Sequence, residues 1–327
     1  MILTVTPNPS IDRTVTLDSP LVRGAVHRVR SVSTEPGGKG VNVARALTLA
    51  GVDTVALLPA IATDPIVTAL RDAEVAFVCV PTAGAVRSNI TITETGGTTT
   101  KLNEPGAALH AQTLQALTAA VLEHAERASW VVLSGSLPPG VPDSWYAEVV
   151  ALLATMDCRV AVDTSEAPLS ALAAAFDRYA PDLIKPNAEE LAGLVGSNAS
   201  TFEDAVAHGD PEPVVAAAGE LIERGARTVL ATLGAAGAVL VDRSGSWLAT
   251  PPPIVARSTV GAGDSSLAGY LRAHIAGADM AECLRMAVAY GSAAAALPGS
   301  ALPSPAQIDP DAVRVAPLSL ISHPTHS

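Results

Sequence analysis

The feature that most constrains the fold of this chain is a repeated alternation of short apolar segments with longer helical patterns. The apolar segments have the length of single strands and lie at residues 2–5, 55–58, 130–133, 159–162, 183–185 and 228–233. Helical patterns separate the later segments, which calls for parallel strands joined by right-handed crossovers. Apolar residues make up 49% of the chain and aromatic residues only 3%, so Ala, Val and Leu must build the core. We therefore predict an α/β fold with one large, mostly parallel sheet.

Polar residues follow these strands directly. They are residues 134–136, Asp163, Asn187 and residues 232–234, and Asp12 comes shortly after the first strand. Because open α/β sheets bind ligands beyond the carboxyl ends of their strands, we expect these residues to line one edge of the sheet.

Two stretches depart from this alternation. Residues 11–35 and 86–103 alternate polar with apolar side chains, as strands exposed on one face do, and Gly96-Gly97 gives a hairpin signal. We predict that they form a small β-sheet lid on a body made of residues 1–10, 36–85 and 104–315. Residues 316–327 lie in a tail rich in Pro, Ser and His, which we expect to be loosely ordered.

A glycine-rich loop opens a predicted helix near residue 261. Gly261, Ala262, Gly263 and Asp264 stand where free N–H groups and the helix dipole attract an anion such as phosphate. Asp264 has two interpretations, as an N-cap or as a general base that takes a hydroxyl proton during phosphoryl transfer.

Two common nucleotide motifs are absent from the sequence. Ser266 occupies the third glycine position of a dinucleotide-binding motif, and Gly40 follows Lys39 where a P-loop requires Ser or Thr. The expected anion site is therefore neither a dinucleotide-binding loop nor a P-loop.

Composition excludes several classes of protein. A net charge of −12 argues against binding to nucleic acid or to an anionic membrane surface. The sequence shows no apolar run of about 18 residues and no secretory signal pattern, so we expect a cytoplasmic protein. Cys79, Cys158 and Cys283 are isolated, so neither structural zinc nor a disulfide is expected.

Two motifs together resemble the signatures of the ribokinase-like, PfkB-type sugar kinases. Residues 35–45 (Glu-Pro-Gly-Gly-Lys-Gly-Val-Asn-Val-Ala-Arg) resemble the first signature, and residues 260–265 (Val-Gly-Ala-Gly-Asp-Ser) resemble the second. Residues 6–9, 134–140 and 185–190 extend the resemblance to about residue 300. The resemblance implies a three-layer α/β/α fold and phosphoryl transfer from ATP, with Mg²⁺ and a monovalent cation as further cofactors.

Details at residues 6–12, 38–40, 87–89 and 100–106 resemble the branch of that family that acts on sugar phosphates, which includes fructose-1-phosphate kinase and tagatose-6-phosphate kinase. The resemblance thus implies a ketohexose monophosphate as the acceptor. Fructose 1-phosphate is the first expectation, and tagatose 6-phosphate or fructose 6-phosphate is the alternative.

The resemblance assigns a sugar site to Asp12, Gly38, Asn42 and Ser136. A carboxylate such as Asp12 can accept from two adjacent hydroxyls, although an Asx turn after Pro9 would also explain it. Gly38 would let the helix start approach the sugar. Asn42 can donate and accept there, or it is a plain helix residue.

Four cations are candidates for binding the phosphate that the substrate already carries. Arg28, Arg87 and Lys101 are expected on lid strands, and Lys39 at the helix start facing them. Each could instead be a solvated surface cation. We expect Arg87 and Lys39 to matter most.

The nucleotide side rests on the resemblance as well. Asn187 and Glu190 form an Asn-x-x-Glu pattern that is associated with Mg²⁺, held through water, although Glu190 could simply be a first-turn helix acid. The residues expected to border ATP are Lys185, Asn187, Thr232, Gly234, Gly237, Gly261, Gly263 and Ser292.

With an acceptor site and a donor site assigned, Asp264 lies between them, which favours the base over the cap. A hydrolase that uses Ser136 is excluded because residues 134–138 do not read Gly-x-Ser-x-Gly. A sugar-phosphate sensor without activity is the alternative outside enzymes.

Exposed strand edges on the lid predict a homodimer joined through the lids.

Overall fold

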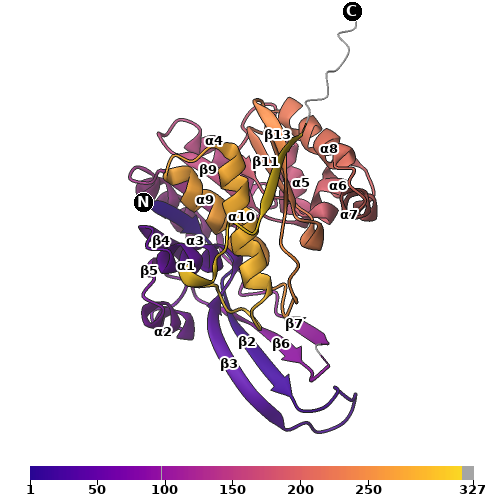
Figure 1. The fold of residues 1–327 in the computed structure, drawn as a ribbon. Coiled ribbons are helices and arrows are strands. Elements are labelled where there is room, and N and C mark those ends of the chain that lie inside the picture. The colour runs from indigo at the N-terminus through magenta and orange to yellow at the C-terminus, as the bar shows by residue number, and fades with distance from the viewer. Residues whose placement is uncertain (97, 319–327) are drawn as a thin grey trace, which may run out of the picture.

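The computed structural model describes residues 1–96 and 98–318 (Figure 1). Its main sheet has ten strands, in the spatial order β14 (Arg314–Leu318), β13 (Gly245–Thr250), β12 (Ala238–Asp242), β11 (Thr228–Thr232), β10 (Leu183–Ile184), β9 (Arg159–Asp163), β8 (Trp130–Ser134), β1 (Ile2–Val5), β4 (Thr54–Pro59) and β5 (Ala76–Val80). The strands from β11 to β5 pair in parallel, while β12, β13 and β14 are antiparallel. The predicted mostly parallel sheet is confirmed.

Helices cover both faces of this sheet. They are α1 (Lys39–Leu49), α2 (Pro65–Asp72), α3 (Ala111–Ala125), α4 (Trp145–Leu153), α5 (Glu166–Ala173), α6 (Ala188–Val195), α7 (Ala199–Ala207), α8 (Glu212–Glu223), α9 (Ala262–Ile275) and α10 (Met280–Ala295), with short 3₁₀ turns at Gly234–Ala236 and Pro305–Gln307. Alternate strand residues feed two buried clusters, since Val131 packs with α3 to α8 and Val132 packs with α1, α9 and α10. The three-layer α/β/α fold is confirmed.

A second, four-stranded sheet projects from this body in Figure 1. Its strands follow the order β3 (Val29–Gly37), β2 (Ser10–Leu17), β6 (Arg87–Thr93) and β7 (Thr99–Asn103). β6 and β7 form the hairpin that Gly96-Gly97 indicated, and β2 pairs in parallel with β6. These strands come from the two predicted insertions. The division into a lid and a body with the stated boundaries stays a prediction.

The two faces of the lid sheet differ in character. Residues that share a face with Asp12 through the strand pairing are polar, among them Thr14, Asn89 and Lys101. The other face carries Val15, Val32, Ile90, Ile92 and Leu102. The polar face meets the body, because a Cβ on Gly299 would lie 3.1 Å from Thr14 Oγ1.

Two expectations need correction. Arg28 was placed on a lid strand, but β3 begins at Val29 and Arg28 lies in the exposed loop before it. The tail was expected to be loose from residue 316, yet residues 316–318 belong to β14, where Pro317 pairs with Trp247. An edge strand tolerates a proline because its outer N–H has no strand to bond. The rest of that tail, residues 319–327, lies outside the described residues.

The body brings the ends of several strands to the starts of two helices. The carboxyl ends of β1, β8, β9 and β11 meet at one edge of the sheet, as parallel strands must. α1 and α9 pack against each other next to the sheet and both begin near that edge. Within the described residues, no helix has the length and apolarity to cross a membrane.

Candidate active site

The start of α9 is an open backbone donor site. Gly261 is the N-cap and adopts a left-handed conformation, with φ of 76°, and no side chain caps the helix. Ala262, Gly263 and Asp264 form the first turn, so their N–H groups have no partner within the helix. The Ala262 N–H donates to the carbonyl oxygen of Thr259 at 3.4 Å, which leaves those of Gly263 and Asp264 for a ligand. Donors at the positive end of a 14-residue helix are suited to an anion.

Asp264 is buried in this first turn and does not act as a cap. Its side chain is only 6% exposed, and its Oδ2 accepts a hydrogen bond of 2.9 Å from Asn42 Nδ2. Asn42 is itself buried in α1, and its Oδ1 has no hydrogen-bond partner. The N-cap interpretation of Asp264 is therefore wrong, and so is that of Asn42 as a plain helix residue.

Two lysines share one buried carboxylate beside α9. Asp163, at the end of β9, is 1% exposed, and its Oδ1 lies 2.7 Å from Lys39 Nζ while its Oδ2 lies 3.1 Å from Lys185 Nζ. Lys185 also touches the anion site, because a Cβ on Gly263 would lie 3.2 Å from Lys185 Nζ. The glycine thus makes room for an ammonium group against the helix start.

The charges in this cluster shift one another's pKa. Burial raises the pKa of Asp264 to about 6, assisted by the nearby Asp163 carboxylate and opposed by Lys39 and Asn42. Burial would also raise the pKa of Asp163, but Lys185 and Lys39 outweigh it and hold that pKa below its usual range. Burial alone would lower the pKa of Lys39, but the carboxylates of Asp163 and Asp264 outweigh burial and raise that pKa. Asp264 is therefore the group of this cluster that titrates near neutral pH.

Two of the predicted sugar residues, Asp12 and Gly38, lie at the base of the lid. Asp12 Oδ1 accepts hydrogen bonds from Ser10 Oγ at 2.7 Å and from Asn89 Nδ2 at 3.0 Å. A Cβ on Gly37 would overlap the Asp12 carboxylate, so this glycine is needed for the packing of β3 on β2. Gly38 is the N-cap of α1 with φ of 103°, and a Cβ there would lie 2.7 Å from Thr6 Cγ2.

Arg87 links the lid to the body. Its Nη2 donates to the carbonyl oxygen of Asn8 at 3.2 Å and lies 3.4 Å from Ser136 Oγ, while its Nη1 donates to the carbonyl of Glu104. Its buried Nε has no partner. Arg87 and Ser136 therefore lie together where the lid meets the body, and the buried Nε–H of Arg87 is a donor that no described protein group uses.

The structure does not bring all four candidate cations together. Lys39 is paired with Asp163, and Lys101 and Arg28 are exposed, with no ion pair to any described residue. Arg87 is the cation of this set that lies against Ser136.

The predicted nucleotide residues lie around the ends of β10 and β11. Asn187 Oδ1 accepts from the Glu190 N–H, and Glu190 Oε2 accepts from the Asn187 N–H, both at 2.8 Å, so they form a capping box at the start of α6. Thr232 forms a bridge with Asn187. Gly234 begins a 3₁₀ turn, and Gly237 allows close approach to the carbonyl of Ala249. Ser292 lies on α10, next to Gly291, which packs on the first residue of α9.

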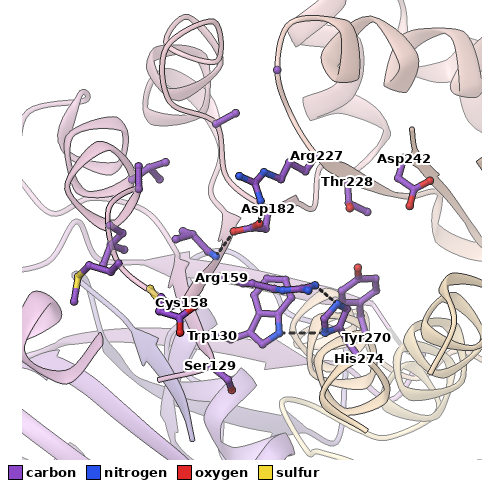
Figure 2. Close-up of a pocket in the computed structure, with 18 of the residues that line it drawn as sticks. Ser129, Trp130, Cys158, Arg159, Asp182, Arg227, Thr228, Asp242, Tyr270 and His274 are labelled. Atoms are coloured by element: carbon purple, nitrogen blue, oxygen red, sulfur yellow. Dashed lines mark hydrogen bonds and ion pairs between the residues drawn. The ribbon is translucent and has the colours of Figure 1, made fainter. Parts of the chain in front are cut away.

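A cavity of about 1080 Å³ lies at the opposite edge of the sheet, away from every predicted site residue. Figure 2 shows Trp130, Arg159, Tyr270 and His274 gathered on one side of it and Asp182 with Arg227 on another. Arg227 Nη1 pairs with Asp182 at 2.9 Å, and Arg159 packs over the Trp130 ring. These side chains contact one another, and Met280, the first residue of α10, also lines the cavity.

The sequence analysis did not assign three residues that lie in the candidate active site. Asp163 was recognised only as a polar residue after a strand, and neither Asn89 nor Asn8 was assigned to the site. Asp163 pairs with residues 124 and 22 positions away, and no local pattern encodes such contacts. The confinement of all three lysines of the chain to motifs was the signal that could have led to it.

Comparison with known proteins agrees with this geometry. The family described as "pfkB family carbohydrate kinase" matches residues 6–307. The chain belongs to the PfkB family. It is therefore an ATP-dependent sugar-phosphate kinase, and the interpretation as a sensor without activity is set aside.

Two relatives of this PfkB kinase are named 1-phosphofructokinase. The protein from Xanthomonas campestris is 37% identical over 88% of this chain and 89% of its own length, and that from Rhodobacter capsulatus is 37% identical over 94% of both chains. Phosphofructokinase-2 from Escherichia coli, crystallised with substrates and products, matches the fold with a TM-score of 0.85 and 33% identity, over 94% of this chain and 96% of its own.

Proposed function

We propose that this kinase transfers the γ-phosphoryl group of ATP to a free hydroxyl of fructose 1-phosphate and forms fructose 1,6-bisphosphate. The observation that carries the proposal is the buried Asp264 carboxylate, held by Asn42 at the start of α9 and close to two ammonium groups. The names of the relatives from Xanthomonas and Rhodobacter support this acceptor.

Other ketohexose phosphates are the alternative acceptors. Further relatives are named ATP-dependent 6-phosphofructokinase isozyme 2, from Escherichia coli, and D-tagatose-1-phosphate kinase, from Klebsiella oxytoca. Arg87 beside Ser136 could bind a phosphate at either end of a ketohexose, so fructose 6-phosphate and tagatose 6-phosphate stay as second candidates.

Asp264 acts as the general base in this mechanism. A pKa of about 6 leaves the carboxylate ionised at neutral pH, yet close enough to the working pH to accept a proton efficiently. Asn42 fixes Oδ2 by donating to it, which directs the free oxygen toward the acceptor hydroxyl. The unpartnered Asn42 Oδ1 can accept a hydrogen bond from a sugar hydroxyl beside it.

The transferred group gathers charge that the helix start and the lysines can neutralise. The N–H groups of the first turn of α9 would bind its oxygens, and Lys185 lies against the same turn. On the acceptor side, Asp12 would bind sugar hydroxyls and Arg87 the phosphate already present.

The donor set fits magnesium held mainly by water and phosphate. Among the described residues, no group of three or more His, Cys, Asp or Glu side chains is placed to hold a metal ion. Glu190 keeps one carboxylate oxygen free of the capping box, and Mg²⁺ in kinases is commonly bound by few carboxylates and several waters. Asn187 and Glu190 would hold it from the protein side, and the ion would neutralise phosphate charge.

We include a monovalent cation in the proposal as a further cofactor. Phosphofructokinase-2 from Escherichia coli has been solved in complex with potassium. Activity in KCl that exceeds activity in choline chloride of equal ionic strength would support a cation site. Equal rates in the two salts would remove it.

The acceptor is tested by measuring ADP release from Mg-ATP. The panel is fructose 1-phosphate, fructose 6-phosphate, tagatose 6-phosphate, fructose and ribose, with Asp264→Asn as the control enzyme. We expect the highest kcat/KM with fructose 1-phosphate and a large loss of kcat in the control, because the base is gone while binding contacts stay. Turnover of free sugars alone would contradict a phosphorylated acceptor, and a control with wild-type kcat would contradict Asp264 as the base.

A further inference from the structure

Asp163 has no direct part in the mechanism above, yet it is among the most buried charged groups in the described chain. It is 1% exposed at the end of β9, and each of its two oxygens faces one ammonium group. Burying an ionised carboxylate is costly unless its partners compensate it. The protein therefore contains a charged trio, Lys39–Asp163–Lys185, at a buried position where an apolar residue would cost less free energy to bury.

The trio spans the anion site. Lys39 is the first residue of α1, and its charge interacts with Asp264 as well as with Asp163. Lys185 reaches Gly263 in the first turn of α9. A lysine ammonium sits on a flexible four-carbon stem, so it contributes to a site only if something holds it in place. Asp163 is the group in contact with both ammonium groups.

We propose that Asp163 is a positioning residue, whose carboxylate holds the ammonium groups of Lys39 and Lys185 so that both face the phosphoryl group at the start of α9. The identity of that group rests on the proposed function. In this role Asp163 acts through the two lysines and not on a substrate. It acts by fixing two point charges that would otherwise repel each other and turn toward solvent.

Selective acylation of lysines tests this placement without any sugar. The chain has three lysines, and exposed Lys101 on the lid serves as an internal reference. Trace labelling with acetic anhydride, read by mass spectrometry, should modify Lys39 and Lys185 slowly relative to Lys101 in the wild type. In Asp163→Asn both ratios should rise severalfold, because the carboxylate that pairs with each ammonium group is gone.

Kinetics separate positioning from a purely structural role. Asp163→Asn should lose about 100-fold in kcat, as misplaced catalytic groups do, with much smaller changes in KM. The acidic limb of its pH profile should move to lower pH, because the carboxylate that helps to raise the pKa of Asp264 is gone. In the double variant with Lys185→Met, the combined loss should fall short of the product of the single losses, because Lys185 is no longer there to be positioned.

Asp182→Asn is a matched control. Asp182 is a half-buried carboxylate at the opposite sheet edge, where it accepts from the Val160 N–H at 2.8 Å and pairs with Arg227 (Figure 2). This control should lower the melting temperature but leave kcat and both labelling ratios unchanged. If Asp163→Asn behaves like the control, the proposal is overturned.

A second comparison applies if Asp163→Asn does not fold. Asp163→Leu combined with Lys185→Met removes the carboxylate together with one partner, a replacement that buried ion pairs often tolerate. Lys39 labelling should be faster in this double variant than in Lys185→Met alone, where Asp163 still holds Lys39. Equal labelling would overturn the proposal. The labelling results decide the role of Asp163 even if the substrate panel shows that fructose 1-phosphate is not the acceptor.

Discussion

At the scale of single residues, Asp264 combines two opposing requirements. A general base must be ionised at working pH, which burial disfavours, and it must also hold a proton well enough to take one. Burial and the Asp163 carboxylate raise the Asp264 pKa, while Lys39 and the Asn42 amide limit that rise. Lys39 and Asp163 are therefore both charged groups of the site and groups that set the pKa of Asp264.

The pKa of Asp264 predicts the acidic limb of the pH profile. We expect kcat/KM to fall about tenfold for each pH unit below about 6, because the protonated carboxyl cannot accept the hydroxyl proton. Initial rates between pH 4.5 and 8 would measure it, after the enzyme is shown to remain folded by circular dichroism. A profile flat down to pH 5 would rule out Asp264 as a base with this pKa.

The same shift predicts a pH-dependent stability difference. Folded Asp264 holds its proton more tightly than an unfolded Asp, whose pKa is near 3.8, so its favourable contribution is lost as pH rises through about 6. Asp264→Asn does not ionise. It should therefore gain stability over the wild type as pH rises from 4 to 7.5, by up to about 3 kcal/mol. Urea unfolding at both pH values measures this, and a difference that is constant with pH would contradict it.

At the scale of elements, apolar runs and helix stops predicted the parts of the fold that are locally encoded. α1 ends before Gly51 and α9 before Gly277, both with positive φ, as their stop signals indicated. β14 was not predicted, because its stability comes from pairing with β13 and not from a local pattern. The proline and the short length of this segment argued against a strand. Likewise, the motifs located Lys39 and Lys185, but only the folded sheet brings Asp163 between them.

The junction of β3 and α1 gives a prediction of its own. Gly37 lies against Asp12, so Gly37→Ala should push the carboxylate out of its hydrogen bonds with Ser10 and Asn89. We expect kcat/KM for the sugar phosphate to fall about 10- to 100-fold, the worth of one charged hydrogen bond. KM for ATP should stay unchanged, because Asp12 lies on the acceptor side.

Gly96→Ala is the control for that variant. Gly96 belongs to the same lid sheet, in the β6–β7 hairpin, and a Cβ there meets nothing within 4 Å. It should retain wild-type kcat/KM. Equal behaviour of the two alanine variants would mean that Gly37 does not position Asp12.

At the scale of the whole molecule, the lid leaves one surface unexplained. Val32 and Leu102 are 43% and 53% exposed on the lid face opposite Asp12, and Val15, Ile90 and Ile92 share that face. An apolar sheet face of this kind is typical of an association surface. We therefore propose a homodimer in which two lids pack these faces together.

Substitutions on the apolar lid face should break this dimer. Val32→Glu with Leu102→Glu places two like charges on a surface that the symmetry brings against its own copy, so four carboxylates would meet. We expect the mass from light scattering to change from twice to once that of the 33.1 kDa chain. Leu152→Glu, on α4 and 47% exposed, is the matched control and should leave the mass unchanged.

Because Asp12 and Asn89 lie on the reverse of the same sheet, loss of the dimer should also raise KM for the sugar phosphate more than KM for ATP. A wild-type protein that is monomeric at micromolar concentration would refute the association, whereas a dimer that survives both substitutions would place its interface elsewhere.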